Sequence, residues 1–331
     1  MRFFRLVFAA LLSASIAVAA EDFTHEFRAM GTFFRLTFYE TGARAGGEAA
    51  RAAEAEVRAI ERACNRFDPA SELARLNAAA FRRPVTCSER LWELFSAADR
   101  HVRGSGGAFD PTVAPLMKLW GFHRKRRALP GAEEIAEAMA AVGWTRFVRL
   151  DAEARTVRYL RSGVGADFGG IAKGYALDRV KAVLHRHGIR RALLDFGGNI
   201  GCVSAPGDPP FRIGIMDPEA PDRYLAVQEM RGGCAATSGN YERYVSIGGK
   251  QYTHIMDPRT GEPVEGMLSV TVVTPCGTDS DALSTAVFVR GAEYAREICR
   301  KIPGTGVLIV RRTAGRREVT GYGTLASAAD K

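Results

Sequence analysis

A carboxylate and a hydroxyl stand four residues apart in the last part of the chain. Asp281 and Thr285 would share one face of a helix, because side chains at i and i+4 lie one above the other. A hard-oxygen pair of this kind suits Mg²⁺, which prefers carboxylates, water and the phosphates of a ligand. The simpler interpretation is that the Ser and Asp residues of this stretch only cap the start of a helix.

A glycine pair with a nearby lysine is the second candidate. Asp167-Phe168-Gly169-Gly170 precedes Lys173, and the pattern predicts Asp167 at the tip of a strand and the glycines at the start of a helix. Glycines let a ligand approach the backbone, a helix N-terminus favours phosphate, and a lysine adds a point charge. A plain strand–helix connection with a capping Asp explains the same residues equally well. The motif recurs as Asp195-Phe196-Gly197-Gly198, which suggests a repeated strand–turn–helix unit without establishing one.

His254 is the third candidate. It precedes the turn signature Asp257-Pro258-Arg259-Thr260-Gly261, and Asp, Pro and Gly explain that turn by themselves. A lone histidine is more often structural, but at neutral pH it can act as a general base. A metal pair, a phosphate cradle and a base together fit phosphoryl or nucleotidyl transfer.

Two better-known phosphate-binding classes are excluded. A kinase requires a His-Arg-Asp catalytic loop and a glycine loop before its Asp-Phe-Gly, and the chain has neither in that order. The sequence also has no G-x-x-x-x-G-K-[ST] motif and no dinucleotide fingerprint that opens a helix.

Hydrophobic periodicity predicts the elements that must position these residues. Helices are expected over 47–64, from Ser71 for a short stretch, and over 88–101, 133–142, 171–187 and, as a pair, 280–300. Strands are expected over 26–39, 147–150, 156–160, 192–196 and 307–311, with strands and turns over 211–273 that include a glycine hairpin at 246–252. This mixed order with many hairpins predicts an α+β protein. No Pro- or Ser-rich linker divides the chain, so we expect one compact unit over residues 21–331.

Composition and charge indicate which class of protein this is. The 331 residues are 47% hydrophobic and carry a formal charge of +9, values typical of a globular protein. The basic residues are 7 Lys and 39 Arg, and they are interleaved with acids rather than concentrated, which argues against a nucleic-acid partner. The one dense block, residues 124–127, is interpreted as a solvated loop in preference to an anion-binding patch.

The first twenty residues predict export. Arg2 and Arg5 precede an apolar run over 6–12 and the small residues of 17–20, the pattern of a cleaved secretory signal peptide. The run is too short to span a membrane, and no Cys near the cleavage point supports a lipid anchor. We therefore expect a periplasmic or otherwise exported protein without a transmembrane anchor. Its six cysteines could form disulfides or remain buried thiols.

Several longer segments, taken in order, resemble the ApbE family, the FAD:protein FMN transferases. They cover about residues 27–310, so the resemblance extends over essentially the whole chain after the predicted signal peptide. The matching segments are Ala29–Thr32, Phe109–Leu116, Leu119–Phe122, Asp167–Ala176, Gly197–Asn199, Thr237–Tyr241, His254–Gly261 and Asp281–Ala286.

The resemblance implies a fold, a reaction and a set of residues. The fold would be a T-fold-like antiparallel sheet with helices packed on it. The reaction would move FMN from FAD to a Ser or Thr hydroxyl of a partner redox protein, membrane-bound or secreted, and release AMP. The metal, Mg²⁺, would be held by Asp281, Thr285 and the carbonyl of Gly170, with His254 as base. FAD would contact Met30, Phe67, Trp120, Gly121, Phe122, Asp167, Lys173, His254 and Ile255.

Two departures from the family pattern leave alternatives open. Some members carry a second Asp where this chain has Ser284, so Thr285 and water would then contribute more to metal binding. Relatives also differ at the position that corresponds to Phe67, which in them lies over the flavin, and some relatives hydrolyse FAD to FMN and AMP. The alternatives to a transferase are therefore an FAD pyrophosphatase at the same site and a flavin-binding or storage protein without turnover.

Overall fold

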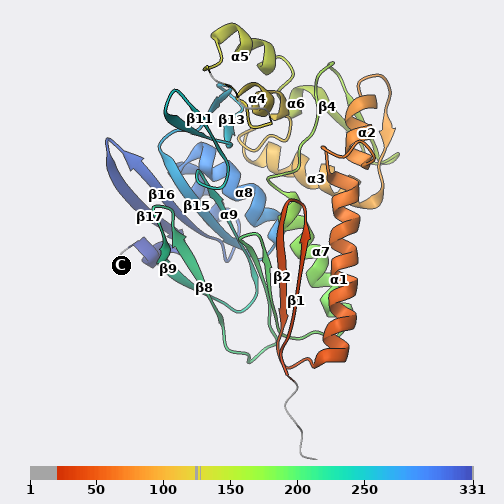
Figure 1. Ribbon diagram of the computed structural model, residues 1–331, viewed down its shortest axis with the longest axis vertical. Helices are drawn as coiled ribbons and strands as arrows, with labels where there is room; N and C mark the ends of the chain where they lie inside the picture. The colour runs from red at the N-terminus through yellow and green to blue at the C-terminus, as the bar shows by residue number, and fades with distance from the viewer. Residues whose placement is uncertain (1–20, 124–125, 127, 330–331) are drawn as a thin grey trace, which may run out of the picture.

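An eight-stranded antiparallel sheet organises the protein. The computed structural model describes residues 21–123, 126 and 128–329; the predicted signal peptide and most of the basic block at 124–127 lie outside them. Each strand of the sheet is antiparallel to its neighbours (Figure 1). The strands, in spatial order, are β1 Phe23–Ala29, β2 Thr32–Phe38, β6 Ala192–Phe196, β7 Asn199–Val203, β10 Gly233–Gly239, β15 Met267–Thr274, β16 Gly306–Thr313 and β17 Arg316–Gly323.

Helices supply the rest of the scaffold and confirm the α+β class. The helix predictions hold to within a few residues at most ends, and the helix over 280–300 is a pair, as expected. Two short helices, α4 and α6, are not predicted by the periodicity. The helices are α1 Ala43–Cys64, α2 Glu72–Ala79, α3 Glu89–Gly104, α4 Ala114–Leu119, α5 Ala132–Met139, α6 Trp144–Phe147, α7 Ala172–Arg186, α8 Gly277–Arg290, α9 Ala292–Lys301 and the 3₁₀ turn η1 Ala326–Ala329.

The strand predicted over 26–39 is wrong as a single element. Met30 and Gly31 turn the chain back on itself with positive φ values of 50° and 75°, a conformation that glycine adopts without steric cost and that suits a two-residue hairpin. The strand periodicity is correct on both sides of this turn, and Phe27 pairs with Phe34 across it. Edge strand β17 is likewise absent from the predictions, because its charged and glycine-rich sequence has little apolar alternation.

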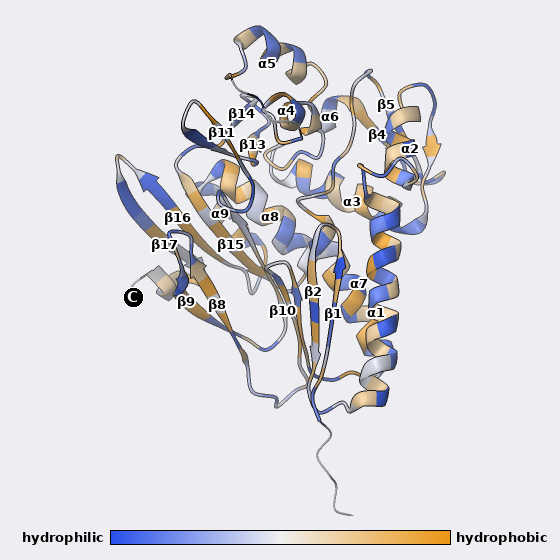
Figure 2. Cartoon of the chain, in the orientation of Figure 1, coloured by the Kyte–Doolittle hydropathy of each residue, from blue (hydrophilic) through white to orange (hydrophobic). Residues whose placement is uncertain are grey.

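The main core lies between the sheet and helices α1, α7 and α8. Residues Ala49, Ala53, Val57 and Ile60 of α1 recur at spacings of three and four and are fully buried, as expected for a helix with one apolar side. Figure 2 shows both hydrophobic and hydrophilic residues along this helix. Helices α7 and α8 pack on each other and against β7 and β10, respectively, which places their N-termini beside the sheet.

A second apolar cluster covers the opposite face of the sheet, where a hairpin and the C-terminal 3₁₀ turn pack. The remaining short strands form small sheets around the large one. They are β3 Val85–Thr86 with β5 Thr156–Tyr159 and β4 Val148–Asp151; β8 Phe211–Asp217 with β9 Ala220–Met230; β11 Tyr244–Ile247 with β12 Lys250–Thr253; and β13 Met256–Asp257 with β14 Glu262–Pro263. The β11–β12 hairpin turns at Gly248 and Gly249, as predicted.

The structure bears on the cysteines and on the helices. All six cysteines lie in the described part of the chain and are free thiols, four of them buried. No helix among the described residues is both long and apolar enough to cross a membrane.

Candidate functional site

The N-terminal halves of α7 and α8 meet at the centre of the candidate site. Asp281 is 4% exposed, and its Oδ2 accepts a hydrogen bond of 2.9 Å from the backbone N–H of Gly174 in the first turn of α7. The helix containing Asp281 begins at Gly277, so Asp281 and Thr285 lie inside α8 and do not cap it. The sequence-based capping interpretation is therefore wrong for Asp281 within its own helix.

This bond changes the expectation for the start of α7. The sequence leaves a phosphate site and a plain strand–helix connection equally open at this helix N-terminus, and the structure places the Asp281 carboxylate on the N–H of Gly174. A carboxylate at the first turn is favourable for the same electrostatic reason as a phosphate. An anionic ligand here would therefore need a cation between it and Asp281.

Gly170 and Thr285 adjoin each other across the helix junction. A Cβ atom added to Gly170 would lie 3.2 Å from the Thr285 Oγ1 and 3.4 Å from the ring of Phe109. Any side chain at Gly170 would crowd this space, so glycine lets the Thr285 hydroxyl lie close to the backbone of residue 170. The structure thus brings the three residues predicted to bind the metal, Gly170, Asp281 and Thr285, to one junction.

Ser284 does not take the place of a second carboxylate. Its hydroxyl donates to the carbonyl oxygen of Asp281 at 2.8 Å and lies 2.8 Å from the Ser238 Oγ. Ser238 also lies 3.4 Å from the Thr285 Oγ1. The described residues contain no group of three or more His, Cys, Asp or Glu side chains placed to hold a metal, so a metal here depends on hydroxyl and carbonyl oxygens with a single carboxylate.

Asp167 combines a turn with an ion pair. Its Oδ1 accepts from the N–H of Gly169 at 2.9 Å, and its Oδ2 lies 3.3 Å from the Arg66 guanidinium. In contrast to the prediction, Asp167 is not at the tip of a strand: residues 160–166 form neither helix nor strand, and Asp167 donates its N–H to the Pro111 carbonyl. The second Asp-Phe-Gly-Gly copy ends β6 and turns directly into β7, so the suggested strand–turn–helix repeat is absent.

His254 is held in the form that can accept a proton. Its Nδ1 lies 3.1 Å from the Arg243 carbonyl oxygen, and because a carbonyl only accepts, the Nδ1 carries the hydrogen and the Nε2 is left as the basic nitrogen. Burial, with the nearby Arg243 and Lys173 cations, lowers the pKa of His254 to about 4, against the opposing effects of the carbonyl and of Asp167. The imidazole is therefore neutral at pH 7.

Glu242 joins these charges although the sequence analysis did not select it. Burial, and then the Asp281 carboxylate, raise the pKa of Glu242, while Lys173 and Arg243 oppose the rise. Glu242 is surrounded by protein atoms and yet exposed to solvent, because it lies in a concave part of the surface. Its position directly after the Thr237–Tyr241 segment is the only sequence signal that could have found it.

The Trp-Gly-Phe segment is anchored by its tryptophan. Trp120 is 5% exposed, donates its Nε1–H to the Gly261 carbonyl at 2.9 Å and packs on Tyr252. The Trp120 ring therefore packs against other parts of the protein. Gly121, with a φ of 90°, makes the turn between Trp120 and Phe122. Phe122 is the member of the segment that reaches the cavity described below.

The remaining predicted contacts differ in their exposure. Phe67 is 64% exposed and its ring meets His123 edge-on at 5.3 Å. Met30, in the β1–β2 turn, donates its N–H to Glu61 at 2.6 Å. Ile255, next to His254 in the chain, is buried, and its carbonyl accepts from the Val264 N–H at 2.9 Å.

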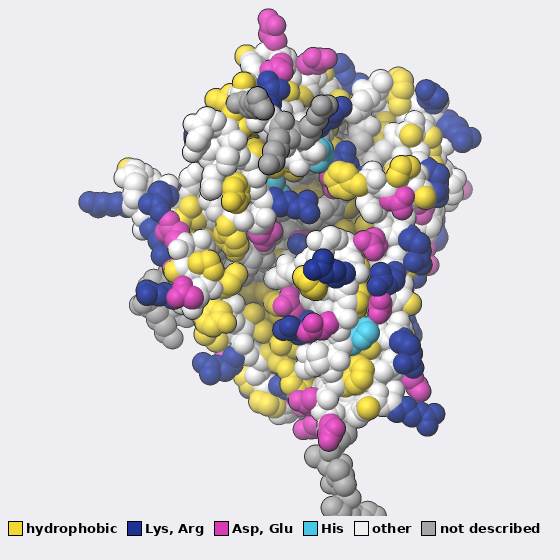
Figure 3. All heavy atoms as spheres, viewed as in Figure 1, with side chains coloured by type: hydrophobic (Ala, Val, Ile, Leu, Met, Phe, Trp, Pro, Cys, Tyr) yellow, Lys and Arg dark blue, Asp and Glu magenta, His cyan; other side chains and the backbone are white. Residues whose placement is uncertain are grey.

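A cavity of about 330 Å³ lies beside these groups. It is lined by Met117, Phe122, His123, Glu242, Arg243, Tyr244 and Val245. Figure 3 shows a hollow in this face of the molecule with Lys or Arg and His side chains at its edge. Aromatic, cationic and carboxylate groups around one cavity suit a ligand that has both a ring and a phosphate.

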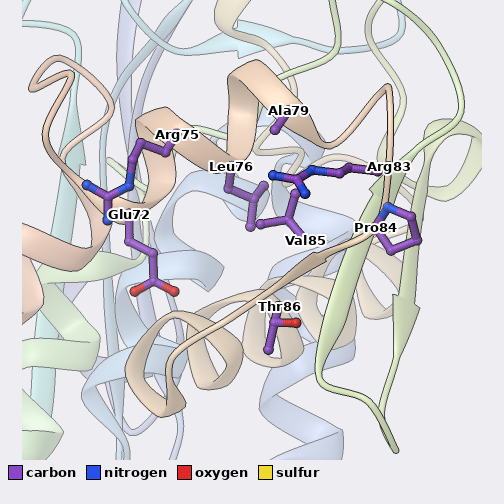
Figure 4. A pocket seen from close by; sticks show the side chains of 8 residues that line it. All are labelled: Glu72, Arg75, Leu76, Ala79, Arg83, Pro84, Val85 and Thr86. Carbon is purple, nitrogen blue, oxygen red and sulfur yellow. The ribbon is translucent and has the colours of Figure 1, made fainter.

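A larger cavity, of about 590 Å³, lies between α2 and β3, away from the predicted site residues, none of which lines it. Figure 4 shows Arg75 and Arg83 on either side of Leu76. The one carboxylate there, Glu72, accepts from the N–H and the hydroxyl of Ser88 at 2.6 Å each. Its acceptors are committed to the start of α3, and size alone does not make this cavity the site.

Taken together, the fold and the site define an α+β protein in which the N-terminal halves of α7 and α8 meet near Asp281, Thr285 and Gly170, close to a cavity with aromatic and charged side chains. The ApbE family model matches residues 30–309. The chain belongs to the ApbE family, whose curated relatives carry the name of a transferase enzyme.

Relatives and solved structures agree with that assignment. An FAD:protein FMN transferase of Treponema pallidum is 36% identical over 74% of this chain and 72% of its own, and one of Klebsiella pneumoniae is 31% identical over 87% and 84%. The ApbE protein of Thermotoga maritima matches with a TM-score of 0.80 and 32% identity over 90% of this chain and 96% of its own. The apo flavinyl transferase ApbE of Pseudomonas stutzeri has a TM-score of 0.80 at 27% identity over 94% and 98%.

Proposed function

We propose that this protein is an FAD:protein FMN transferase that depends on Mg²⁺ and attaches FMN to a Ser or Thr hydroxyl of a partner redox protein. The observation that carries the proposal is the junction of α7 and α8, which gathers Asp281, Thr285 and Gly170 next to Lys173 and His254. The names of the relatives support the reaction. The acceptor is proposed to be membrane-associated or secreted.

The residues at the junction fit Mg²⁺. A carboxylate, a hydroxyl and a backbone carbonyl are hard oxygen donors, and the absence of a side chain at Gly170 leaves the Thr285 hydroxyl close to the backbone there. Asp281, Thr285 and the Gly170 carbonyl would hold the ion. When bound, Mg²⁺ would neutralise the FAD diphosphate and stabilise the AMP leaving group.

The protein's own groups account for the remaining chemistry. The neutral Nε2 of His254 accepts the proton of the incoming hydroxyl as its oxygen attacks the phosphorus of the FMN half. The bond from that phosphorus to the AMP oxygen breaks, so AMP leaves with the bond electrons and the acceptor gains FMN. Lys173 offers a cation to the phosphates, and Phe122 and Phe67 offer ring faces.

The test is an AMP assay with a matched pair of variants. The protein is incubated with FAD, Mg²⁺ and an acceptor domain, and AMP, free FMN and acceptor-bound FMN are quantified. Asp281→Asn keeps an oxygen that can accept from Gly174 but removes the charge. Asp279→Asn is the control, because Asp279 lies on the same helix and pairs with His101 at 2.9 Å.

The outcomes separate the candidate activities. Acceptor-dependent AMP release that falls at least a hundredfold in Asp281→Asn and little in Asp279→Asn supports the transferase. Equal amounts of AMP and free FMN, with or without acceptor, would make the protein a pyrophosphatase. Bound FAD with no AMP under any condition would refute catalysis and leave a flavin-binding protein.

We also propose that the protein is exported. The support is the pattern of residues 1–20, with basic residues, a short apolar run and a small-residue cleavage site. Fractionation of producing cells and N-terminal sequencing test it: a periplasmic protein that begins near Glu21 is expected, and an uncleaved cytoplasmic protein would contradict the proposal.

A further inference from the structure

Helices α7 and α8 begin with the same pattern. Gly174 and Asp178 are four residues apart on α7, and Gly277 and Asp281 are four residues apart on α8. Each pair therefore lies on one face of its helix. The two faces are turned toward each other.

The glycines form the contact point of the crossing. A Cβ added to Gly277 would lie 2.6 Å from the Gly174 carbonyl oxygen, and one added to Gly174 would overlap the carbonyl of Gly277. Backbone therefore touches backbone, which only glycine permits at both positions. The positively polarised ends of two helices are thus brought close together.

Each aspartate caps the helix of the other. Asp281 accepts from the N–H of Gly174, as described above. Asp178 accepts from the N–H of Gly277 at 2.7 Å with its Oδ1, and from the N–H and hydroxyl of Thr278 at 2.8 and 2.7 Å with its Oδ2. Each carboxylate thereby offsets the partial positive charge at the N-terminus of the other helix, and the arrangement is reciprocal.

Asp178 also accepts a hydrogen bond from the Cys276 thiol at 3.0 Å. Burial, and then the charge of Asp178, raise the pKa of Cys276 to about 11, so the thiol keeps its hydrogen and donates it. Asp178 thus binds three consecutive residues, Cys276 to Thr278, and serves as the N-terminal cap that α8 does not obtain from its own cap residue.

The reciprocity ends at the ligand site. Asp281 shares its part of the junction with Thr285 and Gly170, whereas the bonded partners of Asp178 are all at the start of α8. Asp178 fixes where α8 begins, and through it the position of Asp281 one turn further on. We propose that Asp178 is a positioning residue for the metal site, acting through α8 rather than on the ligand; this rests on the Mg²⁺ site of the proposed function.

The experiment measures Mg²⁺ binding, with the metal alone as the probe, by calorimetry on the whole protein well below its melting temperature. Asp178→Asn keeps one oxygen for Gly277 but turns an amide against the Thr278 N–H; Asp178→Ala removes the cap. Glu72→Ala is the matched control, since it removes the carboxylate that binds Ser88 at the start of α3, a helix without a predicted site residue.

The expected result is a Mg²⁺ dissociation constant raised about tenfold to a hundredfold in both Asp178 variants, in the range for residues that orient metal ligands. Glu72→Ala should lower the melting temperature and leave Mg²⁺ affinity unchanged. Wild-type Mg²⁺ affinity in a folded Asp178→Asn would overturn the inference and leave the metal site standing. Mg²⁺ binding that is absent, or unaffected by Asp281→Asn, would overturn the metal site itself and the inference with it.

Discussion

Replacing Gly174 with alanine tests whether the α7–α8 crossing depends on direct backbone contact. The new methyl group would overlap the Gly277 carbonyl oxygen and would lie 2.6 Å from its carbon and 2.7 Å from the Asp281 Cβ. Unstrained carbon contacts begin at about 3.5 Å. The helices must therefore separate by roughly 1 Å, which also lengthens the bond from Gly174 to Asp281.

The size of the effect follows from opposing contributions. Overpacking of this kind costs about 1–3 kcal/mol, and weakening a bond to a buried carboxylate adds about 1 kcal/mol. Alanine gains up to about 1 kcal/mol over glycine in helix propensity. The net expectation is a loss of about 2 kcal/mol, which lowers the melting temperature by roughly 3 °C in a protein of this size.

Thermal unfolding and the AMP assay check this expectation against a matched substitution. Gly104 ends α3 with a negative φ, and a Cβ added there would meet nothing within 4 Å. Gly104→Ala should therefore be neutral, or stabilising by up to about 1 kcal/mol through helix propensity. Equal melting temperatures for the two variants, with full AMP release by Gly174→Ala, would refute the close-contact argument.

Three further predictions concern the site. His254→Gln should abolish most AMP release. In the wild type, kcat/KM should stay constant through neutral pH and fall only below about pH 5, because protonation of a base with a pKa of about 4 removes its free nitrogen. A pH–rate profile with an inflection near pH 6.5 would contradict this. Trp120→Phe should cost about 1–3 kcal/mol in urea unfolding because the Gly261 carbonyl loses its donor, while a variant as stable as wild type would count against an anchoring role. Phe67→Ala should leave stability within about 0.5 kcal/mol because the side chain is exposed, yet weaken FAD binding by fluorescence titration; unchanged affinity would remove Phe67 from the ligand site.

Local patterns in the sequence predicted most elements correctly, because apolar spacing follows from burial on one face. The α1 stripe and the Ser71 cap, which accepts from the Ala74 N–H at 3.0 Å, are of this kind. The β1–β2 turn was missed because one phenylalanine-rich alternation continues on both sides of Met30. Edge strand β17 was missed because an edge needs little apolar surface.

The sequence predicted several residues of the candidate site, but it did not predict how they are arranged. Asp281 and Thr285 were identified by their spacing, but the hydrogen bond from Gly174 joins residues 107 positions apart, and no local pattern encodes it. Glu242, Arg66 and Asp178 entered only through the structure, for the same reason. Trp120 was predicted to contact the ligand. In the structure its ring is buried and bonded to Gly261, and Phe122 is the residue of that segment that lines the cavity.

The reciprocal caps also bear on how the protein matures. They connect residues 99 to 107 positions apart, so closing them costs loop entropy that is recovered only when both helices are in place. A chain that has formed α7 but has not yet docked α8 lacks the proposed site, so FAD bound there would stabilise only the completed fold by mass action. If the protein binds FAD as proposed, flavin binding during refolding would therefore report the docking of α8 on α7.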